Sequence, residues 1–250
     1  MLFDHLAIIQ LPTLGEDLTA GEATVSTPKD NTGEIQTAEL FQRRWLSQNA
    51  FEIELTRPAS FTFKAGQTIL FMHESLSRYY SLISTPDDQI IAFCVHLVRN
   101  GGFSPILANA KIGSRFKFTG PHGYFTFKPS SRTPVFIATG TGIAPFVSFA
   151  RSGIRDFILL HQAISADELY YQSDFIQITS KYFACLSETP VKESSCPNVF
   201  CGKISDCISN NLPSRSYDFY LCGDREMIQD VTLLADERFP GSFVFTEIFF

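Results

Sequence analysis

The sequence contains no uncharged apolar run of the ~18 residues that a helix needs to cross a bilayer. Its first residues, Met1 to Gln10, include apolar side chains, but they lack the Lys- and Arg-rich start and the unbroken apolar run of a secretory signal. These absences argue against an integral membrane segment and against export. We therefore expect a soluble, cytoplasmic protein.

Positive charge is also scarce. The 20 Lys and Arg residues are outnumbered by 26 Asp and Glu residues, and the formal net charge is -6. A chain with this balance does not bind nucleic acid by electrostatics alone, so we expect no nucleic-acid partner. With 44% hydrophobic residues, the chain of 250 residues is too apolar to be disordered as a whole, and it can form one large or two small domains.

The sequence lacks the cysteine spacing of an iron-sulfur protein. Cys196 and Cys201 form a C-x4-C pair, but no C-x2-C pair follows, so the plant-type cluster pattern is absent. In a chain without an export signal, the six cysteines are expected to be free thiols. For Cys185, Cys196, Cys201 and Cys207 we therefore favour an ordinary loop over a metal site, and no metal is predicted.

The rhythm of the sequence changes near its middle. Residues 35 to 128 contain short β-type runs separated by turn residues, which is typical of an antiparallel barrel or sandwich. The runs are 51–55, 68–71, 79–83, 90–98 and 115–119. Residues 129–134 then form a proline-bounded linker.

Residues 134 to 250 alternate between apolar strands and helices. Strands are predicted at 135–139, 157–160, 182–186, 218–222 and 243–249, and a helix at 226–237. Another helix is expected to begin at Ser165, because Ser165 and Glu168 have the spacing of a capping box. This alternation predicts a parallel sheet covered on both faces. Residues 1–34 fit neither half, and we interpret them as an amino-terminal extension.

The first strand of the second half ends in a glycine turn, Gly140-Thr-Gly142, and an apolar helical stretch follows with Pro145 in its first turn. At the carboxyl end of a parallel strand, glycines let the backbone approach a ligand, and the following helix offers free amides to a phosphate. Pro145 stands where the third glycine of the usual G-x-G-x-x-G pattern would be. On this evidence the turn binds a nucleotide or is a plain turn.

Two motifs in the first half carry groups suited to a cofactor. Arg78-Tyr-Tyr-Ser81 lies on a predicted strand and offers a guanidinium for a diphosphate, a phenol ring for a flat heteroaromatic and a hydroxyl for a ring nitrogen. Gly101-Gly-Phe-Ser104 is a second glycine turn whose amides could meet a phosphate. Arg and Tyr also occur on ordinary strands, so neither motif decides alone.

Taken together, the motifs occur in an order that resembles the ferredoxin-NADP reductase superfamily, over about residues 36 to 250. They are Arg78-x-Tyr80-Ser81, Gly101-x-x-Ser104, Gly120-Pro-His-Gly-Tyr-Phe125, Gly140-Thr-Gly-Ile-Ala-Pro145, Tyr220-Leu-Cys-Gly223 with Met227, and Glu247-x-Phe249. The resemblance implies a two-domain fold, in which an antiparallel β-barrel that binds FAD (35–128) precedes an α/β domain with a parallel sheet that binds NADH or NADPH (134–250).

The resemblance also implies roles for residues at the flavin. Arg78 would hold a flavin phosphate, Tyr80 would lie against the isoalloxazine, and Ser81 would approach flavin N5. The neighbouring Tyr79 is predicted to bind the cofactor as well. The side chain of Ser104 and the amides of Gly101 and Gly102 would bind the FAD pyrophosphate.

A second set of implied roles concerns the pyridine nucleotide. Gly140, Thr141 and Gly142 would cradle its pyrophosphate, Cys222 and Gly223 would lie beside the nicotinamide, and Glu247 would lie near the flavin. The alternative for Cys222 is a small buried residue at a strand end. A terminal aromatic, Phe249 or Phe250, would cover the flavin face that the nicotinamide must reach. Ser81, Cys222 and Glu247 are thus the predicted catalytic residues.

Two positions bear on the choice of nucleotide. Ile164 stands where phosphate-selecting members of the superfamily often carry Arg, and Glu188 stands at the next usual basic place. A carboxylate repels a 2'-phosphate and accepts hydrogen bonds from ribose hydroxyls. We therefore predict a preference for NADH.

Three functions remain open from the sequence. The first is an FAD enzyme that takes hydride from NADH and passes electrons to a separate carrier such as ferredoxin. The second is a flavin reductase, for which flavin is a substrate that leaves. The third is an electron-relay subunit whose residues 1–34 dock on a larger complex.

Overall fold

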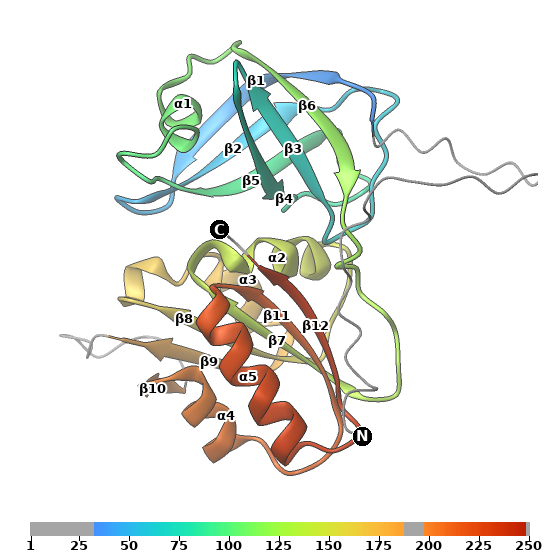
Figure 1. Ribbon diagram of the computed structural model, residues 1–250, viewed down its shortest axis with the longest axis vertical. Helices are drawn as coiled ribbons and strands as arrows, with labels where there is room; N and C mark the ends of the chain where they lie inside the picture. Colours follow the sequence, from blue (N-terminus) through green and yellow to red (C-terminus); the bar gives the residue numbers. More distant parts are fainter. Residues whose placement is uncertain (1–32, 188–197, 249–250) are drawn as a thin grey trace, which may run out of the picture. The chain divides into compact units, whose positions relative to one another are not determined.

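The computed structural model describes residues 33–187 and 198–248. The predicted extension, apart from Gly33 and Glu34, lies outside these residues, as do Glu188, Cys196, Phe249 and Phe250. The described residues belong to one compact unit. They contain an antiparallel sheet, followed in the chain by a parallel sheet with helices (Figure 1).

The antiparallel sheet has six strands in the order β4-β3-β6-β1-β2-β5. Their bounds are β1 Gln36–Trp45, β2 Ala50–Thr56, β3 Thr68–His73, β4 Leu76–Ser81, β5 Ile90–His96 and β6 Arg115–His122. The two edge strands meet where Leu82, just after β4, pairs with Phe93 of β5. This contact closes the sheet, and the predicted barrel is confirmed.

Phenylalanine rings fill the barrel. Phe71 is fully buried, and its ring lies 5.1 Å from that of Phe93, 6.1 Å from Phe116 and 6.4 Å from Phe118. Along β6 buried and exposed residues alternate, as expected for a strand with one face toward the core. Helix α1, Ser104–Asn109, covers this core with the buried side chain of Leu107.

The parallel sheet also has six strands, in the order β10-β9-β8-β7-β11-β12. Their bounds are β7 Thr133–Thr139, β8 Phe157–Ala163, β9 Thr179–Leu186, β10 Val199–Cys201, β11 Tyr217–Gly223 and β12 Phe243–Ile248. The helices are α2 Ala144–Arg151, α3 Gln172–Ile176, α4 Ile204–Asn211 and α5 Arg225–Arg238, with 3-10 turns η1 Gly140–Ile143 and η2 Ala166–Glu168.

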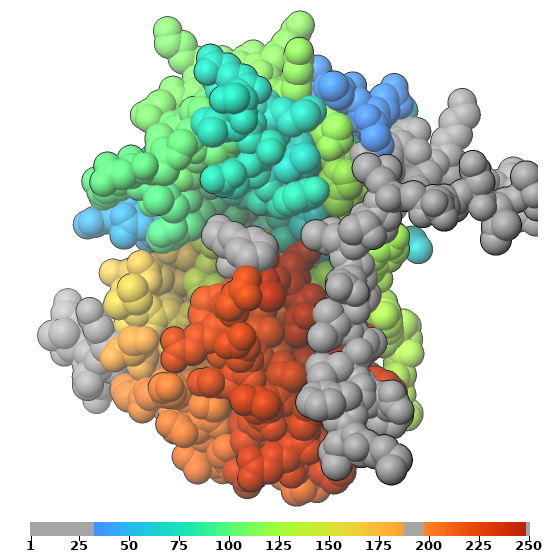
Figure 2. All heavy atoms as spheres, in the orientation of Figure 1, coloured from blue at the N-terminus to red at the C-terminus, as the bar shows by residue number. Residues whose placement is uncertain are grey.

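Helices cover both faces of this sheet, as predicted. Phe136 of β7 packs in one cluster with Phe146 of α2, whereas its neighbour Ile137 packs in another with Ile208 of α4 and Val231 of α5. Successive residues of a strand point to opposite faces, so β7 has apolar residues at both. In Figure 2 the orange-red side chains from the last part of the chain form much of the surface of the parallel half on the side shown, beside yellow and orange side chains from earlier elements.

Two predicted elements are wrong in their details. The capping box at Ser165 starts no α-helix, because η2 is a single 3-10 turn whose Ser165 makes no side-chain cap. The chain must next bury Leu169 and Tyr170, and only then does α3 begin. The strand predicted at 79–83 runs instead from Leu76 to Ser81, because the chain leaves β3 there and Leu82 pairs with β5.

Replacing Phe136 by alanine tests the core beneath the parallel sheet. Its ring is fully buried and lies 4.8 Å from that of Phe146 and 4.4 Å from that of Phe157. We expect Phe136→Ala to lower the free energy of unfolding by about 3 to 5 kcal/mol in urea titrations. Phe41, which is 60% exposed, is the control. Phe41→Ala should change the free energy of unfolding by less than about 1 kcal/mol. Equal losses would contradict this assignment of the core.

Candidate functional site

Three side chains that are distant in the sequence converge where strands β4, β11 and β12 end. The Oγ of Ser81 donates a hydrogen bond of 3.0 Å to Oε2 of Glu247, and the Sγ of Cys222 lies 4.0 Å from the same oxygen. Ser81 is 2% exposed and Cys222 is fully buried. These are the residues that the sequence predicted to be catalytic, and the fold brings them together.

Burial sets the protonation of this cluster. It raises the pKa of Glu247 to about 7, although the hydrogen bond from Ser81 opposes the shift. Burial and then the nearby carboxyl raise the pKa of the Cys222 thiol well above its usual range. Cys222 therefore stays a neutral thiol, while Glu247 can hold or release a proton near neutral pH.

The glycine turn after β7 is pressed against β11. A Cβ at Gly142 would lie 2.3 Å from the carbonyl oxygen of Cys222, and a Cβ at Gly223 would lie 2.0 Å from Oγ1 of Thr139. Gly140 has a left-handed φ of +50°, and the space where its Cβ would stand is open. The backbone at Gly140 is therefore open to a ligand, whereas Gly142 and Gly223 are required by packing.

A buried histidine supports this turn from beneath. His161 of β8 is fully buried, and its Nε2 lies 3.1 Å from the carbonyl oxygen of Gly140. Burial lowers the pKa of His161 to about 4, so the ring is neutral and Nε2 donates to the carbonyl. Its Nδ1 has no hydrogen-bond partner among the described residues. The bond fixes the direction of the Gly140 carbonyl.

A cavity of about 520 Å³ lies at the carboxyl edge of the parallel sheet. From the parallel half it is lined by Thr139, Gly140, Thr141, Gln162, Ala163, Ile164, Glu168, Tyr170, Ser187 and Asp224. The barrel contributes Asn49 and His96. Such an edge is the usual place for a ligand in open α/β sheets. Two residues of the predicted cradle, Gly140 and Thr141, lie in its wall, and Gly142, next in the chain, is buried.

The side chains of the predicted flavin-binding strand β4 differ in their exposure to solvent. Arg78 is exposed and donates to the neighbouring carbonyl of Ser77, and it makes no ion pair in the described part of the chain. The Tyr79 ring is 58% exposed and meets His122 edge-on at 5.5 Å. The Tyr80 ring packs instead near Phe103 at 6.1 Å, and burial raises the pKa of Tyr80 to about 12.

The turn at Gly101 lies beside this strand, and it uses some of its predicted ligands internally. A Cβ at Gly102 would lie 3.2 Å from Leu76 of β4. The amide of Gly101 donates to the carbonyl of Val98 at 2.8 Å, and Oγ of Ser104 accepts from the amide of Val98 at 2.9 Å. The Gly101 amide is thus engaged, while the Ser104 hydroxyl keeps its proton to donate.

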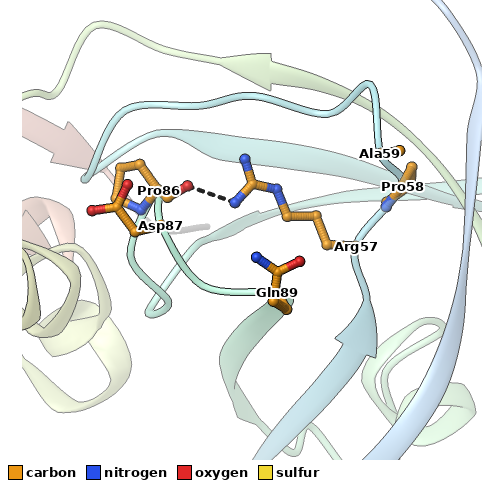
Figure 3. Close-up of a pocket in the computed structure, with 6 residues that line it drawn as sticks. All are labelled: Arg57, Pro58, Ala59, Pro86, Asp87 and Gln89. Carbon is orange, nitrogen blue, oxygen red and sulfur yellow. Dashed lines mark hydrogen bonds between the residues drawn. The ribbon is translucent and has the colours of Figure 1, made fainter.

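A second cavity, of about 310 Å³, lies in the barrel loops next to Arg57 (Figure 3). Arg57 donates to the carbonyl oxygens of Phe61, Pro86 and Asp88. Its guanidinium therefore holds the loops together. No group of side chains suited to a metal ion occurs among residues 33–187 and 198–248, where Cys185 and Cys207 are buried and Cys201 is exposed.

Sequence reasoning missed several residues of the larger cavity. Asn49 lies in a turn and His96 at the end of β5, in the half that was assigned to flavin. Glu168 was interpreted only as part of a capping box, and Tyr170 was assigned no role. Asp224 lies directly after β11, at the same sheet edge as the glycine turn, and its carboxylate caps α5 by accepting from the amide of Met227. Contacts between the halves cannot be read from strand periodicity.

Two family models match the chain. Residues 38–127 match an oxidoreductase FAD-binding domain, and residues 136–232 match an oxidoreductase NAD-binding domain. The chain belongs to the ferredoxin-NADP reductase superfamily. The ferredoxin NADP+ reductase of Neisseria gonorrhoeae, solved with bound FAD and NADP, has the same fold, with a TM-score of 0.76, 20% identity, and coverage of 87% of this chain and 100% of that one.

Curated relatives of the superfamily share more of their sequence with this chain, at 27% to 34% identity. The electron transfer component of 2-halobenzoate 1,2-dioxygenase from Burkholderia cepacia is 28% identical over 180 residues, which are 68% of this chain and 53% of that protein. Ferredoxin–NADP reductase B of Sorangium cellulosum is 34% identical over 126 residues, which are 47% of this chain and 52% of that protein. The chain thus spans about half the length of these two relatives. The flavodoxin/ferredoxin–NADP reductase of Buchnera aphidicola is 27% identical over 225 residues, or 78% and 87%.

The residues present fit the two cofactors of this superfamily. Arg78 is an exposed guanidinium without a carboxylate partner among the described residues, and the exposed ring of Tyr79 follows it on the same strand. The open backbone at Gly140 borders a cavity large enough for part of a dinucleotide. The described part of the chain contains no helix long and apolar enough to span a membrane.

The raised pKa of Glu247 predicts a specific pH dependence of stability. Its pKa is about 7 in the folded protein against an ordinary 4.5, so between these pH values the folded protein keeps a proton that the unfolded chain has lost. The contribution of Glu247 to the free energy of unfolding therefore falls as pH rises from 4.5 to 7 and is constant above 7. Glu247→Gln removes this titration.

Urea titrations across this range measure the effect. Relative to wild type, Glu247→Gln should gain up to ~3 kcal/mol of stability between pH 4.5 and pH 7. Thr246→Ala, an exposed neighbour on β12, should retain the wild-type slope. If the difference in free energy of unfolding between wild type and Glu247→Gln were the same at every pH, the pKa of the Glu247 carboxyl would not be raised.

Proposed function

We propose that the protein is an FAD-dependent oxidoreductase that takes hydride from NADH and passes electrons to a separate protein acceptor such as a ferredoxin. One observation carries the proposal. Ser81, at the end of the predicted flavin strand, is hydrogen-bonded to Glu247, which lies beside Cys222 at the end of the predicted nicotinamide strand. The flavin and nicotinamide motifs therefore meet at a single point.

When bound, FAD accepts hydride from a reduced nicotinamide and releases the electrons one at a time. The protein's part is to bind and orient. Arg78 would hold a phosphate of FAD, and Tyr79 and Tyr80 would position the flavin ring. The Ser104 hydroxyl and the Gly102 amide would contact the pyrophosphate, whereas the Gly101 amide is engaged with Val98.

At the reacting rings, the proposed residues exclude water and control one proton. The Cys222 thiol is small, neutral and fully buried, so it would add no charge of its own beside a bound nicotinamide. The Ser81 hydroxyl would donate toward the flavin ring in place of Glu247. The Glu247 carboxyl, with its pKa of about 7, would hold the proton at its oxygen when the Ser81 bond is redirected.

The nucleotide would bind along the glycine turn. Gly140 and Thr141 offer backbone to the pyrophosphate, and the turn leads through η1 into α2, whose first residue Ala144 follows an uncapped Ile143. Gly142 lets this turn approach β11, and Gly223 keeps β11 close to Thr139. The glycine turn is thereby held beside the end of β11 that carries Cys222.

Relatives support the assignment of the acceptor. Their names include ferredoxin–NADP reductases and the electron transfer component of a dioxygenase. Rapid anaerobic mixing of the purified, FAD-loaded protein with NADH and then with an oxidised ferredoxin tests both electron-transfer steps. Bleaching of the flavin by NADH and its recovery with ferredoxin support the proposal. A colourless protein that gains flavin only transiently would favour the flavin reductase, and a protein whose flavin NADH leaves unbleached would favour the relay subunit.

Ser81→Ala should slow flavin reduction by NADH about a hundredfold while leaving most FAD bound, because the lost hydroxyl faces the reacting ring and not the diphosphate. Stopped-flow absorbance measures the rate, and the flavin spectrum measures occupancy. Ser77→Ala, which removes an exposed hydroxyl from the same strand, is the control and should leave the rate unchanged. Unchanged kinetics in Ser81→Ala would remove Ser81 from the site.

NADH should be preferred to NADPH in kcat/KM. Ile164 is 56% exposed in the cavity wall, where it offers nothing to a 2'-phosphate, and Glu168 adds negative charge to that wall. Ile164→Arg should shift the ratio of kcat/KM toward NADPH by about tenfold. Ile176→Arg, on the exposed side of α3, is the matched control. A large NADPH advantage in the wild type would refute the preference.

Several assignments stay predictions. The covering role of Phe249 or Phe250 and the effect of Glu188 fall on residues outside those described. The domain limits, 1–34, 35–128 and 134–250, and the cytoplasmic location are likewise part of the proposal.

A further inference from the structure

Two buried thiols outside the candidate site lie against each other under helix α4. Cys185 of β9 and Cys207 of α4 are both fully buried in the apolar cluster on one face of the parallel sheet. The thiol of Cys185 donates a hydrogen bond to the sulfur of Cys207. Neither thiol lines the cavity at the sheet edge, and neither has a role in the proposed function. The two sulfurs therefore form a pair of their own.

The fold fixes both members of this pair. β9 is hydrogen-bonded to β8 on one side and to β10 on the other, so Cys185 lies on an interior strand of the sheet. Helix α4 packs on the same face with the buried side chains of Ile204 and Ile208. Cys207 lies between these two residues in the helix, and its sulfur faces the sheet at Cys185. The contact between the thiols is therefore a property of the folded protein.

The two sulfurs differ in acidity. The hydrogen bond to Cys207, followed by burial, raises the pKa of the Cys185 thiol. The hydrogen bonds from Cys185 and from Asn211 lower the pKa of Cys207, although burial opposes them. Because a thiolate attacks an oxidant and a neutral thiol does not, Cys207 is the nucleophile of the pair and Cys185 is the second thiol.

An exposed side chain reaches the sulfur of Cys207. Asn211 at the end of α4 is exposed, and its Nδ2 lies 3.7 Å from Sγ of Cys207 and donates to the Cys207 carbonyl at 2.9 Å. The sulfur thus lies directly beneath a side chain that solvent surrounds. When Asn211 changes rotamer, a small uncharged molecule such as hydrogen peroxide can reach Sγ.

We propose that Cys185 and Cys207 are a modification site, a dithiol that hydrogen peroxide closes into a disulfide. The Cys207 thiolate attacks one oxygen of the peroxide, the O–O bond breaks, and a sulfenic acid and hydroxide form. The hydroxide takes up the proton that Cys207 released. The Cys185 sulfur then attacks the sulfenic sulfur, the S–O bond breaks, and water leaves with the Cys185 proton. The two thiols lose two electrons, which reduce the peroxide to two waters.

Peptide mapping of the full chain tests the site. Trypsin cleaves after Lys and Arg, so Cys185 falls in peptide 182–192, Cys207 in peptide 204–215 and Cys201 in the separate peptide 193–203. The folded, reduced protein is treated with hydrogen peroxide, and free thiols are then blocked with iodoacetamide. Peptides 182–192 and 204–215 should be recovered joined by a disulfide, and dithiothreitol should separate them.

Variants identify the attacking sulfur. In Cys185→Ser the sulfenic acid on Cys207 has no second thiol to react with, so dimedone, which traps sulfenic acids, should label peptide 204–215. In Cys207→Ser the joined peptides should be lost, and peptide 182–192 should stay unlabelled. Cys201→Ser, an exposed change on β10, is the control and should form the joined peptides like wild type. Label on 182–192 instead of 204–215 would overturn the assignment of Cys207.

The wild type alone decides whether the site exists. If both peptides are recovered alkylated and unjoined at peroxide concentrations that consume the exposed Cys201 thiol, the proposal is overturned. Joined peptides that form only in urea also overturn it, because the contact then belongs to the unfolded chain. The reaction uses neither flavin nor nucleotide, so these results leave the proposed function standing.

Discussion

The hydrogen bond between Ser81 and Glu247 is the interaction on which the site depends. It joins the last residue of β4 in the barrel to β12 at the far end of the chain, across 166 positions of sequence. Both side chains are polar, and placing them away from water is unfavourable unless they satisfy each other. The bond therefore requires that the barrel and the parallel sheet meet with their strand ends aligned.

Aromatic packing keeps that alignment rigid. Phe125, at the end of the barrel segment, lies 5.9 Å from the ring of Phe146 and 6.0 Å from that of Phe149 in α2. Tyr220 of β11 lies 5.9 Å from Phe125, so the strand that carries Cys222 packs against the same group. Because close-packed rings resist small shifts, the sheets are held as one body around the polar contact.

Much of this could be predicted from the sequence. The change from short alternating runs to apolar strands with helices predicted an antiparallel sheet followed by a parallel one. The order of short motifs identified the superfamily. The resemblance implied roles for Ser81, Cys222 and Glu247, and the structure adds the hydrogen bond and the close contact that join them. The helix at Ser165 failed because local capping preference was outweighed by the burial of Leu169 and Tyr170. Asn49 and His96 were missed because nothing local marks a residue that faces another sheet.

The order of the parallel sheet has a further consequence for Glu247. Among the described strands β12 lies at the margin of the sheet and pairs only with β11. A marginal strand has half the ladder of an interior one, so it opens more readily in local fluctuations. The carboxyl that meets Ser81 thus lies on a strand that is held by one neighbour only. Brief detachment would expose the half-buried carboxyl further and give its proton a route to bulk solvent while the rest of the sheet stays paired.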